Sequence, residues 1–202
     1  MIKVIIFDFG GVVLDWADNY VVKHASEIVG INGKRLRKEV DKYSPLLNTN
    51  KISEKNFWSK ILRDANKDGS SLQKLEDIWN REFEKRARLN KNVVLIVKKL
   101  KKNYKVALLS NIIDAHAKYC RKKKYFKGFG KVFLSSEIKM VKPDAKIYRF
   151  VLRKLNIKAH EAIFIDDKIQ NVKGARKVGI HAFQFRNISQ LKKDLNKLGI
   201  KV

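Results

Sequence analysis

The sequence predicts an α/β protein with a doubly wound, Rossmann-like parallel sheet and one helical insertion. Apolar runs of four to six residues alternate with longer segments whose apolar residues recur at helical spacing. This alternation is typical of a parallel sheet with helices on both faces. Segment 16–85 interrupts the alternation, because it contains helical patterns and no clear strand.

Five strands are expected, each a short run rich in β-branched or aromatic residues. Their ranges are 3–7, 104–109, 131–134, 161–165 and 180–185. Asp8 follows the first strand, Ser110 and Asn111 follow the second, and Asp166 and Asp167 follow the fourth. Ligands of such sheets bind beyond the carboxyl ends of the strands, so we expect these side chains to meet in one crevice.

Helices are expected between the strands, where apolar residues recur at helical spacing. The clearest positions are Val93, Val94, Ile96, Val97 and Leu100, and then Ile147, Phe150, Val151 and Leu155. A later helix should end just before Gly179, a residue that favours helix termination. Pro143 is expected at the first position of the helix that precedes the fourth strand.

Two domains are expected from this pattern. Residues 1–15 and 86–202 should form the α/β core, and residues 16–85 should form a helical cap packed over the crevice. The aromatic residues of the cap are expected mainly in its own core and less at a ligand.

Composition narrows the class of protein. The chain has 202 residues, and its single cysteine, Cys120, excludes an internal disulfide framework. No run approaches the roughly 18 uninterrupted apolar residues of a membrane span. We see no secretory signal peptide at the N-terminus. A reduced, soluble, cytoplasmic protein is therefore expected.

Charge is concentrated in the middle of the chain. The formal net charge is +26, and residues 81–160 carry 24 Lys and Arg against 5 Asp and Glu. A solvated, lysine-rich surface is one interpretation, and a footprint for nucleic acid or another polyanion is the other. Aromatic residues do not alternate with the charges, so nucleic acid binding is expected to be at most non-specific. The sequence predicts no oligomeric state.

Acidic residues provide the first candidate site. Asp8 precedes Gly10 and Gly11, which allow a sharp turn and the close approach of a ligand. Asp166 and Asp167 would repel each other and Asp8 unless a cation lies between them. Two carboxylates plus a substrate phosphate suit Mg²⁺. The alternative is that Asp166 and Asp167 only cap the helix that follows them.

Two further segments could contact an anion. Ser110 and Asn111 can both donate hydrogen bonds to phosphate oxygens, although this dipeptide is also common in turns. Lys142 could neutralise a carboxylate or a phosphate as a point charge, although most lysines in so basic a chain are solvated.

Taken in order, these motifs resemble the haloacid dehalogenase superfamily, in particular its members with a helical cap after the first motif. The resemblance extends from Val4 to Phe185. The matching segments are Ile6–Val13 (IFDFGGVV), Leu108–Asn111 (LLSN), Val141–Asp144 (VKPD), Phe164–Asp167 (FIDD) and Asn171–Ala175 (NVKGA).

The resemblance implies a nucleophile and a metal site. Asp8 would attack phosphorus to give an aspartyl phosphate. It would also bind Mg²⁺ together with the backbone carbonyl of Gly10 and the side chain of Asp167. Asp166 would lie close to the metal without being a principal ligand, and Asn171 would support it.

The resemblance also implies a phosphate site. Gly10 and Gly11 would let the substrate approach the backbone. Ser110 would donate to the transferring phosphoryl group, with the Asn111 backbone beside it. Lys142 would hold the nucleophile and the phosphate in place.

One position departs from the phosphatases of this superfamily, which usually place a general acid two residues after the nucleophile. That position is Gly10 here. General acid–base catalysis contributes about 10²–10⁴-fold, so turnover should depend on another source of the proton or on a substrate that needs none. Asp15 or a cap residue could supply the proton, and a substrate with a good leaving group would not need it.

The expected function is a Mg²⁺-dependent phosphohydrolase that acts on a small phosphorylated metabolite. One alternative is a metal-independent 2-haloacid dehalogenase, whose known members lack an acidic pair such as Asp166 and Asp167. The other is a catalytically weak relative whose basic surface binds RNA or an acidic partner. Function is decided by the site, so the fold does not separate these alternatives.

Overall fold

The computed structural model describes residues 1–201 and contains a five-stranded parallel sheet in the order β5-β4-β1-β6-β7. The strands are β1 (Val4–Phe7), β4 (Lys105–Ser110), β5 (Lys131–Leu134), β6 (Ala162–Asp166) and β7 (His181–Gln184). The predicted α/β fold class is confirmed, and no strand end differs from the predicted one by more than one residue. β4 and β6 flank β1 on opposite sides, so the strand order reverses at β1. The crevice is expected at the carboxyl ends of the strands beside this reversal.

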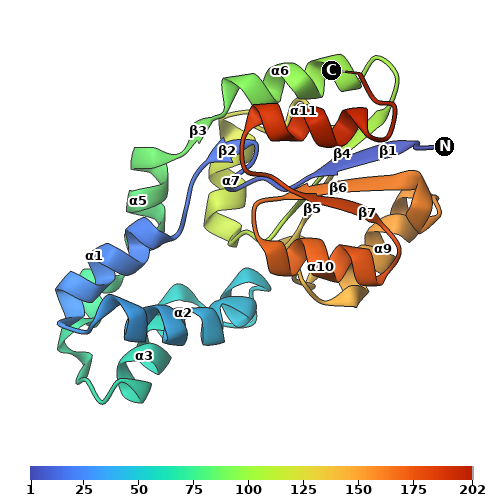
Figure 1. Ribbon diagram of the computed structural model, residues 1–202. Helices are drawn as coiled ribbons and strands as arrows, with labels where there is room; N and C mark the ends of the chain where they lie inside the picture. Colours follow the sequence, from blue (N-terminus) through green and yellow to red (C-terminus); the bar gives the residue numbers. More distant parts are fainter. Residues whose placement is uncertain (202) are drawn as a thin grey trace.

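Helices cover both faces of the sheet (Figure 1). The helices of the core are α6 (Lys91–Leu100), α7 (Asp114–Lys122), α8 (Ser135–Ile138), α9 (Ala145–Leu155), α10 (Ile169–Lys177) and α11 (Ile188–Asn196). A 3₁₀ turn at Ala159–Glu161 precedes β6. α6 and α11 lie on one face, and α9 and α10 lie on the other.

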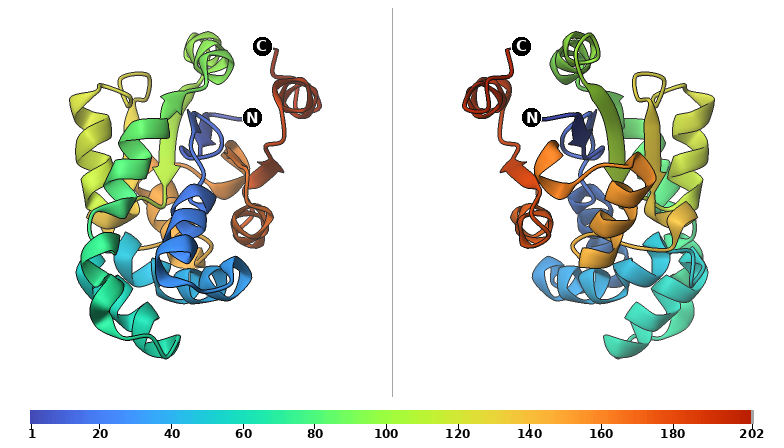
Figure 2. Two further views of the ribbon diagram at one scale, coloured as in Figure 1. Left: turned by 90° about the vertical axis from the view of Figure 1, so that its left-hand side faces the viewer. Right: turned by 90° about the vertical axis from the view of Figure 1, so that its right-hand side faces the viewer.

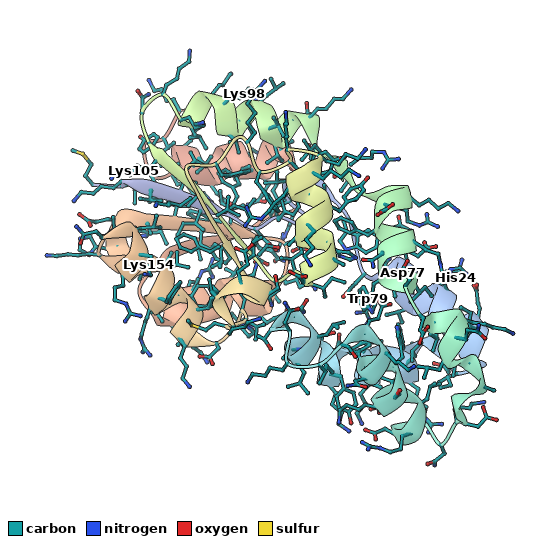
Figure 3. The ribbon with its side chains drawn as sticks, turned by 180° about the vertical axis from the view of Figure 1, so that it is seen from behind. His24, Asp77, Trp79, Lys98, Lys105 and Lys154 are labelled. Atoms are coloured by element: carbon teal, nitrogen blue, oxygen red, sulfur yellow. The ribbon has the colours of Figure 1, made fainter. Side chains whose placement is uncertain are left out.

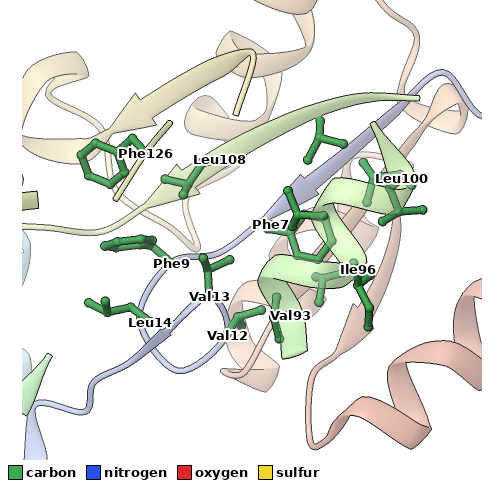
Figure 4. Packing of buried hydrophobic residues seen from close by; sticks show 14 of the residues in the cluster. Phe7, Phe9, Val12, Val13, Leu14, Val93, Ile96, Leu100, Leu108 and Phe126 are labelled. Carbon is green, nitrogen blue, oxygen red and sulfur yellow. The ribbon is translucent and has the colours of Figure 1, made fainter. Parts of the chain in front are cut away.

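Alternation along β1 explains this arrangement. Ile5 and Phe7 pack on the side of α6, α7 and α11, and Val4 and Ile6 pack on the side of α9 and α10. Successive side chains of a strand point to opposite faces, so a strand covered on both faces is apolar throughout. Figure 4 shows Phe7 beside the buried face of α6, close to Ile96.

Two predictions about helix ends have different outcomes. α10 ends at Lys177, just before Gly179, which has a φ of 88°. The expectation for Pro143 is wrong. Asp144 is the N-cap of α9, and its side chain accepts a hydrogen bond from the Lys146 backbone N–H at 2.8 Å. Asp144 occupies the N-cap position next to the first helical residue, so Pro143 lies before the helix and not at its first position.

The insertion contains only helices and turns. These are α1 (Asn19–Val29), α2 (Gly33–Asn48), α3 (Glu54–Asp64), a 3₁₀ turn (Gly69–Ser71), α4 (Leu72–Leu75) and α5 (Ile78–Arg86). They enclose a hydrophobic cluster of their own around the fully buried Phe57 and Trp58. Figure 2 shows these helices, coloured blue to teal, together at one end of the sheet. We retain residues 16–85 as the proposed cap.

Two short strands connect the cap to the core. β2 (Leu14–Asp15) and β3 (Arg88–Leu89) pair antiparallel, so the chain enters and leaves the cap side by side. The Asn90 side-chain amide lies 3.3 Å from the Asp15 carboxylate and donates to it. Within residues 1–201, no helix is long and apolar enough to cross a membrane.

Candidate active site

A cavity of about 530 Å³ lies between the carboxyl ends of the strands and the cap. Core and cap both contribute to its wall. The lining residues used below are Asp8, Gly10, Trp16, Asp18, Asp41, Ser44, Asn48, Trp79, Phe83, Ser110, Asn111, His116, Lys142, Asp167, Lys168 and Asn171. This volume is within the range of small-molecule sites. The predicted crevice is therefore present, and polar side chains from three strand ends meet in it.

A buried ion-pair network forms the floor of the cavity. The ammonium nitrogen of Lys142 lies 2.7 Å from Asp8 Oδ1 and 2.6 Å from Asp166 Oδ2. It also donates to the carbonyl of Leu109 at 3.1 Å. Three partners use all three donors of an ammonium group. Lys142 has a side-chain exposure of only 1%, so it is not one of the solvated lysines.

The network carries excess negative charge. Burial, followed by repulsion from Asp166, raises the pKa of Asp8 well above its usual value, and Lys142 only partly opposes this. Burial acts to lower the pKa of Lys142, but Asp166 and Asp8 together raise it, so the ammonium stays charged. Burial and the charge of Asp166 also raise the pKa of Asp167. One lysine thus faces three carboxylates, an arrangement that a further cation would stabilise.

The two adjacent aspartates have different surroundings. Asp166 Oδ1 accepts from the Lys168 backbone N–H at 2.8 Å and from the Asn171 amide at 2.9 Å. Its Oδ2 accepts from Lys142 and, at 3.0 Å, from Asn171. By contrast, Asp167 Oδ1 is buried and has no hydrogen-bond partner among the described residues. Asp167 is therefore the aspartate with an oxygen free to bind another group, and Asn171 supports Asp166 as expected.

The residues present fit a hard cation such as Mg²⁺. Carboxylate oxygens of Asp8, Asp166 and Asp167 lie within 4.8 Å of one another. Oxygen donors of this kind are the preferred ligands of Mg²⁺. A cation beside the unpaired Oδ1 of Asp167 would satisfy an atom that is otherwise buried without a partner.

The two glycines after Asp8 have different environments. Gly11 has a φ of 75°, and a Cβ atom placed on it would lie 2.5 Å from Asp167 Oδ2. It lies against Asp167 and is not among the residues that line the cavity, so its place in the substrate site stays a prediction. Gly10 does line the cavity, and a Cβ atom there would meet only Trp16, at 3.6 Å or more.

The second strand end also differs from one expectation. Ser110 lines the cavity as predicted. The side chain of Asn111, however, donates to the Lys142 carbonyl and accepts from the Lys142 backbone N–H, both at 2.9 Å. The amide therefore positions the lysine loop and is not free for phosphate. Asn111 is nevertheless among the residues that line the cavity.

The substitute for a general acid at Gly10 is not Asp15. Asp15 is exposed, interacts with Asn90, and does not line the cavity. Asp18 does line it, but Lys168 and Arg37 outweigh burial and lower its pKa, so it holds no proton to donate near neutral pH.

The sequence interpretation missed an aromatic wall at the junction of core and cap. Trp16, Trp79 and Phe83 belong to buried clusters and also line the cavity, so they are not only core residues. His116 of α7 completes the wall, because its ring stacks on Phe83 with centroids 3.8 Å apart. The sequence did contain one signal for this wall, namely a histidine on the apolar face of the helix that follows a strand end.

Comparison with known proteins identifies relatives along the whole chain. A profile of haloacid dehalogenase-like hydrolases matches residues 5–185. D-ribitol-5-phosphate phosphatase of Bacteroides thetaiotaomicron is 26% identical, with 96% of this chain and 97% of that protein covered. Five other curated relatives match over only 52 to 70 residues, which is 12–26% of their own length.

Solved structures that resemble this chain belong to the same family as these relatives. A haloacid dehalogenase-family enzyme of Bacteroides thetaiotaomicron, in complex with magnesium and inorganic phosphate, superposes with a TM-score of 0.69. It is 25% identical, with 95% of this chain and 99% of that chain covered. L-2-haloacid dehalogenase of Xanthobacter autotrophicus shares the fold, with a TM-score of 0.63 and 18% identity over 100% of this chain and 85% of that chain. The chain belongs to the haloacid dehalogenase-like hydrolases.

Proposed function

We propose that this hydrolase is a Mg²⁺-dependent phosphatase that cleaves small phosphorylated metabolites through an aspartyl phosphate on Asp8. The observation that carries the proposal is the network of Asp8, Lys142 and Asp166 beside the unpaired oxygen of Asp167. A phosphatase relative along nearly the full chain and a structural relative that holds magnesium and phosphate support the same reaction.

Asp8 is placed to act as the nucleophile. Its Oδ1 accepts from the Phe9 backbone N–H at 2.6 Å and contacts Lys142, which fixes the carboxylate and leaves Oδ2 for the substrate. Oδ2 forms a bond to phosphorus as the bond from phosphorus to the leaving oxygen breaks. That oxygen leaves with the electron pair and takes a proton from water. A second water then attacks phosphorus, which releases inorganic phosphate and restores Asp8.

The surrounding residues stabilise the charge that develops on the phosphoryl oxygens. The Ser110 hydroxyl can donate to one oxygen, and the positive charge of Lys142 lies behind the nucleophile. Asp8, the Gly10 carbonyl and Asp167 would hold Mg²⁺, which neutralises phosphoryl charge when bound. Asp166 and Asn171 position Lys142.

The dehalogenase alternative does not account for Asp167. Displacement of halide by Asp8 needs no metal, and without a cation the Asp167 oxygen stays buried and unpaired. The likeness to the Xanthobacter enzyme is a likeness of fold.

Phosphate release from a panel of phosphate monoesters tests the proposal. We expect hydrolysis with Mg²⁺, loss of hydrolysis in excess chelator, and recovery when Mg²⁺ is added back. Asp8→Asn should lower turnover at least about 10³-fold with an unchanged circular dichroism spectrum, because an amide is a poor nucleophile. Full hydrolysis in chelator, or chloride release from 2-chloropropionate, would contradict the proposal.

A further inference from the structure

We propose that the cavity selects phosphate monoesters whose alcohol part carries no second anionic group and presents a flat apolar surface. This inference rests on the proposed phosphatase activity, and it concerns the half of the cavity that the cap forms.

The lysines that line the cavity come from the core. Lys142 lies at the floor beside Asp8, and the ammonium of Lys168 lies 4.0 Å from the cap residue Asp18, with which it is paired. Among the described residues, no lysine or arginine of 16–85 lines the cavity. One phosphate group can therefore be neutralised at the floor, and the rest of the substrate meets no lysine or arginine from the cap.

The cap instead contributes carboxylates. Asp18 and Asp41 both line the cavity. Arg37 lies near them, but its guanidinium is engaged with Asp18 through contacts of 3.0 and 3.1 Å. It also lies 3.4 Å from Asp41. Asp18 is thus paired with Arg37 and Lys168, and Asp41 is the less neutralised of the two carboxylates. A second phosphate or a carboxylate on the substrate would approach Asp41 and be repelled.

The wall between the carboxylates and the floor is aromatic and uncharged. The His116 ring is parallel to Phe83 within 12°, and Trp16 meets both rings edge-on at 4.9 and 5.8 Å. The imidazole donates its Nε2–H to the Trp79 carbonyl at 3.0 Å, which fixes the ring. Burial lowers the pKa of His116 to about 3, so the ring is neutral at physiological pH. Such a wall suits a flat apolar group and gives an anion nothing to bind.

Neutral polar side chains complete the cap side. Ser44 and Asn48 of α2 line the cavity, and the Ser44 hydroxyl donates to the Val40 carbonyl at 2.7 Å. The Ser44 hydroxyl is thus occupied, whereas the Asn48 amide is available to contact a hydroxyl or a ring carbonyl of the substrate. A few polar groups in an apolar wall are usual for ligand sites. Nucleoside, flavin and aryl monophosphates fit this description, whereas sugar bisphosphates, nucleoside diphosphates and phosphorylated acids do not.

The test compares benzyl phosphate with 4-carboxybenzyl phosphate, because the methylene group keeps their leaving alcohols similar in basicity. We expect kcat/KM to be about tenfold higher for benzyl phosphate, as repulsion by charges near a protein surface predicts. Asp41→Lys should reduce this preference about tenfold. Glu27→Lys is the matched control, because it makes the same charge change on an exposed cap residue that does not line the cavity.

Equal kcat/KM values for the two esters would overturn the inference, as would an equal effect of Glu27→Lys and Asp41→Lys. Calorimetric binding of benzylphosphonate and 4-carboxybenzylphosphonate, with Mg²⁺ present, separates this inference from the proposed activity. Tighter binding of benzylphosphonate, which lacks the carboxylate, without hydrolysis of either ester would remove the phosphatase proposal and leave the selectivity intact. Equal affinities would overturn the selectivity whether or not the protein is a phosphatase.

Discussion

At the scale of single residues, Gly11 determines where Asp167 can lie. A Cβ atom at this position would overlap the Asp167 carboxylate, and the φ of 75° disfavours any other residue. We expect Gly11→Ala to weaken Mg²⁺ binding about 10–100-fold, as loss of support for a metal ligand usually does. Isothermal titration with Mg²⁺ measures this.

Gly199→Ala is the control for that substitution. Gly199 has a φ of 74°, and no atom lies within 4 Å of its Cβ position. The variant therefore carries the same backbone penalty without the clash. Equal Mg²⁺ affinities of the two variants would mean that Gly11 does not support the site.

Gly10 differs from Gly11 in that it has room for a side chain. An aryl oxide leaves phosphorus without a proton, so the missing acid at this position should slow alkyl phosphates most. We expect Gly10→Asp to raise kcat for benzyl phosphate about 10–100-fold relative to 4-nitrophenyl phosphate. Gly10→Ala is the control for the change in shape. Equal wild-type rates for the two esters would show that another group already supplies the proton.

At the scale of elements, α7 of the core holds α5 of the cap through His116. The folded protein keeps the imidazole neutral to about pH 3, but the unfolded chain takes up a proton near its ordinary pKa of 6.5. Acid therefore favours the unfolded state, and stability falls as pH drops below 6.5. When the pH is lowered from 7.5 to 5.5, this residue should reduce the free energy of unfolding by about 1.4 kcal/mol.

His116→Gln tests this contribution, because glutamine can still donate to the Trp79 carbonyl but does not titrate. Urea unfolding of both proteins at the two pH values gives the difference. Between the two pH values, the free energy of unfolding of the variant should fall by about 1.4 kcal/mol less than that of the wild type. The contributions of all other titrating groups are the same in both proteins and cancel in this difference. An identical pH dependence would mean that His116 is protonated in the folded state.

The elements that the sequence predicted are those whose signal is local. β1 and β6 are continuous apolar runs that end at aspartates, and the buried face of α6 recurs at helical spacing. β2 and β3 have two residues each and exist only because distant segments pair, so no local pattern marks them.

The same distinction applies to the site. The motif residues at the strand ends were predicted, because parallel strands bring their carboxyl ends together. The pairing of Asn111 with the Lys142 backbone and the stacking of Phe83 on His116 join segments about 30 residues apart in the chain. Such contacts depend on the packing of loops and on how α5 meets α7, which residue spacing does not encode.

At the scale of the whole molecule, most of the lysines lie on the outer surface, away from the cavity. The lysines of α6 that were predicted to face outward, Lys98 and Lys99, are exposed, and Lys101 and Lys102 that follow are exposed as well. Figure 3 shows Lys98, Lys105 and Lys154 projecting from the outside of the core. The net charge of +26 thus lies mostly on a solvated surface, where it can attract anionic substrates toward the molecule.

This surface should also attract nucleic acid, but without selectivity. Binding by exposed lysines releases counterions from the phosphate backbone, so affinity should fall linearly with salt on a double logarithmic scale. For six phosphate contacts we expect about a thousandfold weaker binding at 200 mM than at 50 mM salt. Fluorescence anisotropy with single-stranded RNA, structured RNA and duplex DNA measures this dependence. Lys98→Ala and Lys105→Ala should each reduce the salt slope by about one and weaken all three ligands alike. Affinity that survives physiological salt and differs between these ligands would instead make the basic surface a specific binding site.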